Sequence, residues 1–200
     1  EQEGVVIAPF YFVCKGKVDW KGMRSVLLDG RYPTRAVEEN LADLNAALAA
    51  NQNGMNAFKL LIESHGKETV QTYLELLRKH AASKMKETLQ KFTDGKYSAK
   101  ELLDDGSPLK VEITLKNGNC KIDFTGSASV HSGNMNATEA IVKSVTIYVL
   151  RLLLNEPIPL NDGLLEPVSF VLPEGLLNPK FEDDPAKCPA VVGGNVEISQ

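Results

Sequence analysis

Two polar stretches carry the residue types best suited to chemistry in this 200-residue chain. The first, DFTGSASVHSGNMNAT at 123–138, combines two glycines with hydroxyl and amide side chains and leads into an apolar helical pattern. A loop entering a helix presents unpaired backbone N–H groups, which suit an anionic or carbonyl-bearing ligand. The alternative is structural: Asn136 caps the helix and Gly126 makes a turn. The residues alone leave both interpretations open.

The second stretch is VVGGNVEISQ at 191–200. Its glycine pair permits a positive φ or the close approach of another group to the backbone. Hydrogen-bonding side chains surround the pair at Asn195, Glu197, Ser199 and Gln200. The stretch therefore predicts either a ligand-binding loop or a turn followed by a frayed polar tail.

Other reactive residue types give weaker signals. The spacing of His65, His80 and His131 does not bring two histidines together with a carboxylate, so no metal site is expected. The adjacent acids at 104–105 and 183–184 lie in turn-like stretches and are interpreted as solvated loops. Because a sequence alone fixes no spatial neighbours, no catalytic residue is assigned.

Composition narrows the class of protein. Apolar residues make up 43% of the chain and charged residues 24%, as in an ordinary globular protein. The formal net charge of −4 provides no basic surface for nucleic acid. No apolar run is long enough to span a bilayer and the N-terminus lacks the order of a signal peptide, so no membrane partner is expected. Three cysteines without CxxC spacing favour a cytoplasmic location.

The first third of the chain is predicted to be mainly helical, after one short strand. Residues 5–13 are typical of a strand, in which Pro9 indicates an edge position or a bulge, and residues 18–28 are typical of a short helix. From Thr34, the expected N-cap, apolar residues recur in heptad steps through Gly54 to Ile62. This pattern predicts one long helix, and a break at Gly54 is the alternative.

A second long helix is predicted over 67–92, directly after the helix-ending pair His65-Gly66. Because the link between the two helices is so short, their apolar stripes are expected to zip into a long antiparallel hairpin. Such a hairpin would bury its own seam, although the seam could instead dock a partner or a second copy.

The rest of the chain changes to alternating patterns. Strands are predicted over 109–115 and 120–124, joined at the two-residue hairpin signal Asn117-Gly118. A largely uncharged helix over 138–154 is expected to be buried on most sides, with Asn136 as its N-cap, and a further strand is predicted over 166–172.

The order of these elements predicts an α+β fold with a β-hairpin and one buried helix in a mixed body. The predicted domains are an N-terminal strand and short helix (1–32), the helical hairpin (33–92) and an α/β body with Gly/Asn-rich loops (93–200).

Several motifs, in order along the chain, resemble those of the hydantoinase B / 5-oxoprolinase family. DFTGS at 123–127 and GNMNAT at 133–138 are similar to the family's DFTGS and GNINA. Three further matches follow at IPLNDG (158–163), PEGLLNP (173–179) and VVGGNVEISQ (191–200). The N-terminal half is similar more loosely, at Gly4–Ile7, AANQNG and DDGSP. The resemblance covers nearly the whole chain, comes closest to the 5-oxoprolinase branch, and implies an internal piece of a longer B-type subunit or half.

The resemblance implies an activity that needs a second component. The family couples ATP hydrolysis to opening a cyclic amide such as 5-oxoproline or a hydantoin, and some relatives carboxylate ketones. An A-type half or subunit, similar to a kinase fold, binds the ATP, and the B-type half acts on the activated intermediate. This chain has no phosphate-binding GxxxxGK[ST] loop, in keeping with a B-type piece. Metal-binding stretches of the ketone carboxylases have no match here. We therefore expect this fragment to hold no metal and to be inactive alone, and any metal site to lie elsewhere in the full-length, multi-subunit or oligomeric enzyme.

The resemblance also implies a polar cleft for the cyclic amide, where phosphate or amide oxygens meet backbone N–H and side-chain donors. We expect the turns near residues 126, 133 and 194 to converge there. Leu164 departs from the family's Cys, which excludes a thiol nucleophile at that place, and Ile198 departs from its Thr. Glu197 is a candidate base, whereas the catalytic residues stay unassigned. The implied cleft residues are Asp123, Thr125, Gly126, Gly133, Asn134, Asn136, Asn161, Gly163, Gly193, Gly194, Asn195, Glu197, Ser199 and Gln200.

Overall fold

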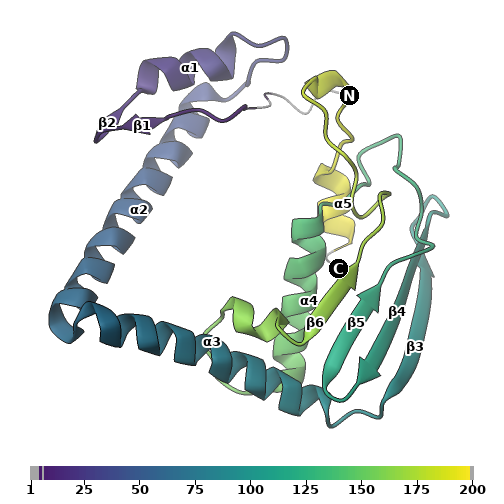
Figure 1. Ribbon diagram of the computed structural model, residues 1–200. Coiled ribbons are helices and arrows are strands. Elements are labelled where there is room, and N and C mark those ends of the chain that lie inside the picture. The colour runs from purple at the N-terminus through teal and green to yellow at the C-terminus, as the bar shows by residue number, and fades with distance from the viewer. Residues whose placement is uncertain (1–4, 6, 199–200) are drawn as a thin grey trace. The chain divides into compact units, whose positions relative to one another are not determined.

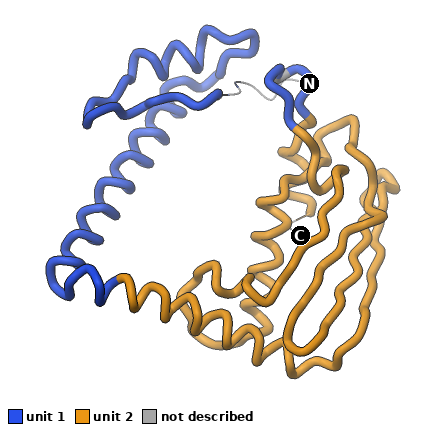
Figure 2. The backbone as a smooth tube through the Cα atoms, in the orientation of Figure 1, with its two compact units in different colours: residues 1–70, 181–188 blue, residues 71–180, 189–200 orange. Residues whose placement is uncertain are grey.

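The computed structural model describes residues 5 and 7–198 of the chain. They form two compact units (Figure 2): unit 1 extends to residue 70 and includes 181–188, and unit 2 comprises 71–180 and the residues from 189 on. Unit 1 consists of a small hairpin and helices, whereas unit 2 is built on a four-stranded mixed sheet (Figure 1). Helices combined with a separate mixed sheet confirm the predicted α+β class.

Unit 1 contains a short hairpin in which β1 (Val13–Cys14) pairs antiparallel with β2 (Lys17–Val18). Lys15 and Gly16 have φ values of 50° and 76°, as the two central residues of a type I′ turn require. The strand predicted over 5–13 is wrong for most of its described residues, of which only Val13 belongs to β1. Since β2 has two residues, the residues before Val13 have no partner in β2 with which to extend the ladder.

The short helix predicted over 18–28 is confirmed as α1 (Trp20–Leu28). Its N-cap, Asp19, accepts a hydrogen bond from the Gly22 N–H at 2.8 Å. Met23 and Leu27 lie one turn apart and are buried, and α1 packs against α2 (Val37–His65).

The long helix α2 continues through Gly54, so the predicted single helix is confirmed and the alternative break is excluded. A glycine inside a helix costs about 1 kcal/mol, which the helix-forming residues on both sides offset. Gly66 ends α2 at a φ of 81°, and its N–H donates to the Ile62 carbonyl at 2.8 Å. The prediction of Thr34 as the N-cap is wrong, because the N-cap residue of α2 is Ala36. The Thr34 hydroxyl accepts a hydrogen bond from the backbone N–H of Ala36.

The buried apolar seam predicted along the long helices is not observed on α2, because none of its residues is buried. Two residues of the predicted seam, Met55 and Phe58, are 45% and 44% exposed, respectively. The next helix, α3 (Lys67–Leu89), belongs to unit 2 from Gln71 on. Because α2 and most of α3 belong to different units, the antiparallel hairpin and the domain division at 32 and 92 stay predictions.

Within unit 2, α3 is packed only in its C-terminal half, and Val70 near its start is buried in unit 1. All ten residues of 71–80 are exposed, whereas Ala81, Met85 and Leu89 are buried against the sheet and the helix α4 (Glu139–Leu154). Among the described residues, no helix combines the length and the apolar character that crossing a membrane requires.

The sheet of unit 2 has the strand order β3 (Gly95–Leu102), β4 (Pro108–Lys116), β5 (Asn119–Asp123) and β6 (Val168–Val171). The first three strands are antiparallel and β6 runs parallel to β5, so the chain crosses back through α4 between them (Figure 1). The predicted turn at Asn117-Gly118 is confirmed, with φ values of 52° and 73°.

Alternate residues of this sheet build its core, because the register aligns Tyr97, Ile113, Ile122 and Phe170 across all four strands. The intervening positions are mainly polar, such as Glu112. The apolar face therefore lies against α4 and the C-terminal half of α3.

The helix α4 is buried along one stripe only, formed by Val142, Leu150 and Leu154. Tyr148 and Leu152 are 66% and 63% exposed, so the prediction of a helix buried on most sides is wrong. Its apolar residues surround the helix, but within unit 2 the sheet covers one side.

Candidate functional site

The loop between β5 and α4 lies against the short helix α5 (Val192–Glu197) at the N-terminal end of α4 (Figure 1). The Gly194 N–H donates to the Asn134 carbonyl at 2.8 Å. The Asn195 side-chain oxygen accepts from the Thr138 N–H at 3.1 Å. We call residues 133–136 and 193–195 together the Asn–Gly cluster.

The glycine pair of α5 serves a close approach of backbones. A β-carbon on Gly194 would lie 2.1 Å from the Asn136 carbonyl oxygen and 2.2 Å from that of Met135. On Gly193 it would meet the Asn134 side chain at 2.7 Å. Neither glycine has a positive φ, and both lie in a helix rather than in a turn or loop. The predicted close approach is therefore confirmed, and the predicted loop or frayed tail is wrong for the described residues 192–197.

Asn136 joins the first half of the cluster to Ala190, which precedes the second half. Its side chain is fully buried, and its Oδ1 accepts from the His131 N–H at 2.7 Å. Its Nδ2 lies within hydrogen-bond distance of three carbonyl oxygens: His131 (2.9 Å), Gly133 (3.2 Å) and Ala190 (3.1 Å). An amide that supplies both donor and acceptor to the backbone can order a polar loop in this way.

The N-cap of α4 is Thr138 rather than the predicted Asn136. The Thr138 hydroxyl accepts a hydrogen bond from the Ile141 N–H at 3.4 Å. The backbone N–H of Thr138 itself donates to the side-chain oxygen of Asn195. This end of α4 is thus capped from inside unit 2, which weakens the predicted anion-binding role of its backbone N–H groups.

A histidine–aspartate pair, which the sequence patterns do not predict, lies next to the cluster. His131 Nε2 lies 2.9 Å from Asp105 Oδ2, and His131 Nδ1 accepts from the Gly133 N–H at 2.9 Å. Since Nδ1 is an acceptor, the proton of the neutral imidazole sits on Nε2 and is donated to Asp105. Hydrogen bonds from the Ser107 N–H and hydroxyl, and then His131, lower the pKa of Asp105. DDGSP and the histidine were each visible in the sequence, but nothing in their spacing predicts that they meet.

Asp123, Thr125 and Gly126 lie where β5 ends. Asp123 accepts from the Thr125 N–H at 2.9 Å, and the hydrogen bonds from Thr125, with Lys121 close by, lower its pKa to about 2. Gly126 has a φ of 92°, and the nearest atoms to a β-carbon there belong to Lys110. Of the three segments expected to converge, those near 133 and 194 are in contact, whereas the atoms nearest Gly126 belong to Lys110.

Asn161 and Gly163 lie at the other end of α4, Gly163 in the short 3-10 helix η1 (Asp162–Leu165) and Asn161 as the N-cap of that helix. Asn161 accepts from the Gly163 N–H at 2.9 Å, and a β-carbon on Gly163 would lie 2.1 Å from the Arg78 carbonyl oxygen of α3. The 16 residues of α4 span about 24 Å, so these two residues do not share a site with the cluster. Leu164, where the family has Cys, is fully buried in the core.

The remaining predicted residues add little to the site. Glu197, the suggested base, is partly buried at the end of α5. Ser199 and Gln200, and also Gly4 of the N-terminal match, lie outside the described residues. Among residues 5 and 7–198, no group of three or more His, Cys, Asp or Glu is placed to hold a metal ion.

The surface left by this packing is small and polar. Ser132, Gly133 and Asn134 are exposed, beside the partly exposed His131. Gly194 and Asn136 hold the backbone at Gly133 and Asn134, so the backbone there need not become ordered when the Asn134 amide meets a small oxygen-bearing molecule.

The chain was also compared with known proteins. The family model for hydantoinase B/oxoprolinase matches residues 1–200. The chain is 34% identical to 5-oxoprolinase 1 of Arabidopsis thaliana over 226 residues, covering 100% of this chain and 17% of that protein. It is 35% identical to the 5-oxoprolinase of Saccharomyces cerevisiae over 182 residues, covering 86% of this chain and 14% of that protein.

A solved structure shares the fold. The ATP-dependent caprolactamase from Pseudomonas jessenii matches with a TM-score of 0.78 at 23% identity, over 94% of this chain and 32% of that one. The chain thus spans about a sixth of the length of these two 5-oxoprolinases and about a third of the solved relative. With a family match over its whole length, the chain belongs to the hydantoinase B/oxoprolinase family.

Proposed function

We propose that this chain is part of the B-type portion of an ATP-dependent hydrolase that opens cyclic amides. The observation that carries this proposal is the family match over residues 1–200. Relatives in this family are named 5-oxoprolinase, and the structural neighbour is an ATP-dependent caprolactamase. A cyclic amide is therefore the substrate class, with ATP consumed by the whole enzyme.

Within that enzyme, the Asn–Gly cluster borders the substrate. Opening an amide ring places negative charge on the former carbonyl oxygen, which fixed N–H donors stabilise. Support for this role comes from the exposed amide of Asn134, which stands on a backbone held by the Gly194 N–H. Asn136 and Gly194 keep this rim rigid, and the other predicted residues of the cluster position it rather than touch the substrate.

The remaining steps belong to other parts of the enzyme. ATP is bound by an A-type partner, either a subunit or another part of the same chain, and this region receives the activated amide. Asn161 and Gly163 support the fold at the far end of α4 and are not part of the substrate site.

Turnover by the full-length protein tests the proposal. Purified enzyme is incubated with ATP and, separately, 5-oxoproline, caprolactam or hydantoin, and both ADP and the ring-opened product are measured. We expect one of these amides to be opened with a matching amount of ADP, and no opening without ATP. ATP turnover that leaves all three rings intact would contradict the proposal. In a parallel incubation with a ketone, product formation that requires bicarbonate would contradict it too and favour a carboxylase.

A further inference from the structure

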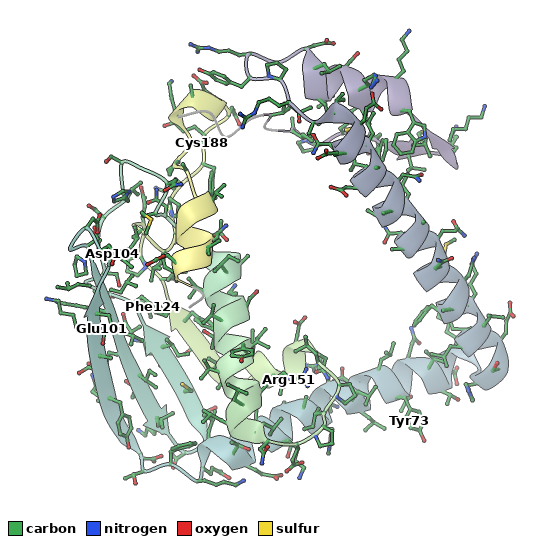
Figure 3. All side chains as sticks on the ribbon, turned by 180° about the vertical axis from the view of Figure 1, so that it is seen from behind. Tyr73, Glu101, Asp104, Phe124, Arg151 and Cys188 are labelled. Atoms are coloured by element: carbon green, nitrogen blue, oxygen red, sulfur yellow. The ribbon has the colours of Figure 1, made fainter. Side chains whose placement is uncertain are left out.

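An apolar groove lies between the sheet of unit 2 and α4, with a volume of about 520 Å³. Its floor includes Tyr97, Val111 and Ile113, and Phe124 lies between the sheet and α4 (Figure 3). Val149 and Leu153 of α4 line the opposite wall. All of these residues belong to unit 2.

The groove is an uncovered part of the core. Tyr97, Ile113 and Ile122 are neighbours on one face of the sheet, yet Ile122 is 7% exposed and Tyr97 47%. Four strands measure about 14 Å from first to last, whereas one helix covers about 10 Å. One helix therefore leaves the β3 side of this face open, with Val149 47% and Leu153 44% exposed beside it.

The chemistry of the groove does not suit a small ligand. Ligand pockets usually place a few polar groups so that they fix the orientation of the molecule. The two hydroxyl groups along this groove are already used: the Tyr97 hydroxyl donates to the Thr93 carbonyl at 2.7 Å, and the Thr146 hydroxyl to that of Val142 at 2.8 Å. Glu101 and Lys110 are the charged residues of a lining that is otherwise almost wholly apolar. Apolar walls of this kind match an apolar stretch of polypeptide.

We propose that an apolar segment of the same polypeptide, from outside residues 1–200, fills this groove. In both 5-oxoprolinases the matched region is 17% or less of the chain, and in the caprolactamase 32%. Each relative therefore carries a large further stretch of the same chain, while its matched region keeps this fold in the solved case. Ile198 of this chain also lines the groove, so the last described residue contacts it. The inference depends on the length of the relatives and not on the reaction.

Photo-crosslinking within the full-length protein tests this inference. Tyr97→p-benzoyl-phenylalanine places a reactive aromatic group in the groove at a position that tolerates an aromatic ring. Val149→p-benzoyl-phenylalanine reports from the opposite wall. After irradiation and digestion, mass spectrometry identifies the peptide attached to each probe. We expect both probes to crosslink, within one molecule, to the same apolar peptide outside residues 1–200.

The matched control is Lys96→p-benzoyl-phenylalanine, since Lys96 neighbours Tyr97 on β3 but lies on the opposite face. We expect it not to capture that peptide. Three results would overturn the inference: crosslinks between two copies, visible as a band of doubled mass; attachment to a co-purified small molecule or lipid; or probes at both groove positions that remain unattached.

Discussion

The two ends of α4 carry the same residue types in different surroundings. At the N-terminal end, Gly194 lets α5 approach the backbone at Met135 and Asn136, and at the C-terminal end, Gly163 lets η1 approach Arg78. In both places a β-carbon would lie 2.1 Å from a carbonyl oxygen. Both ends present an exposed amide, Asn134 at the first and Asn155 at the second, but of the two only the first has a His–Asp pair beside it. Asn and Gly together therefore signal close packing, and a binding role needs further polar groups beside them.

Adding a methyl group at Gly194 or Gly163 should change the free energy of unfolding more than any other variant below, and by a similar amount at both ends of α4. Gly194→Ala and Gly163→Ala each force a carbonyl oxygen to move, so we expect each to lower the free energy of unfolding by about 3 kcal/mol. Denaturant unfolding followed by circular dichroism measures this. Gly193→Ala is the matched control, because its β-carbon meets the exposed side chain of Asn134 and should cost about 1 kcal/mol or less. Equal values for Gly193→Ala and Gly194→Ala would refute the close approach.

Removal of the Asn136 side chain should affect the N-terminal end alone. Asn136→Ala leaves the His131 N–H and several carbonyls without their partner, which we expect to cost about 2 kcal/mol. The neighbouring Asn134→Ala should change the free energy of unfolding by less than about 0.5 kcal/mol, because that side chain is exposed. A comparable loss of stability in both variants would show that Asn136 is not the organising residue.

The His–Asp pair should contribute less. His131→Ala removes the acceptor of the Gly133 N–H and the partner of Asp105, at a cost of about 1 kcal/mol for a partly exposed pair. His80→Ala, an exposed histidine on α3, is the control and should leave thermal unfolding unchanged. Hydrogen exchange at Gly133 gives a local measurement, and protection that persists in His131→Ala would argue against the assigned acceptor.

The smallest effect is expected from acid titration of Asp123, at the end of β5. Its folded pKa of about 2 lies below the ordinary value of 3.8, so its contribution to stability is complete above the unfolded pKa and is lost as pH falls through the folded one. We therefore expect Thr125→Val, which removes the largest cause of the shift, to raise the pKa of Asp123 more than Lys121→Met does. Carboxyl NMR titration measures both, and the reverse order would contradict the assignment.

Sequence patterns predicted the elements that local residues determine. The Asn117-Gly118 turn, the C-terminus at Gly66 and the continuous α2 all follow from the residues at those positions. β3 was missed as an element, because an edge strand with seven of eight residues exposed has no regular apolar alternation. The extent to which α4 is buried depends on what packs around it, which its own composition does not contain.

The candidate site divides in the same way. The residue types of GNMNAT and VVGGNV indicate that another group contacts the backbone at each segment. In the structure, the two segments contact each other. Their pairing joins residues far apart in sequence, as does that of His131 with Asp105. Asn136 was mistaken for a helix cap because an Asn before an apolar helix is typical of one, whereas its burial decides its role.

Asn134→Ala in the full-length enzyme tests most directly whether the exposed rim of the cluster borders the substrate. Ring opening and thermal unfolding are measured on the same preparation, with His80→Ala as the control. We predict an unchanged unfolding temperature together with a fall of about tenfold in kcat/KM for the cyclic amide, since one donor to the substrate is lost. Wild-type kcat/KM in a folded Asn134→Ala enzyme would contradict the account and leave the cluster a purely structural role.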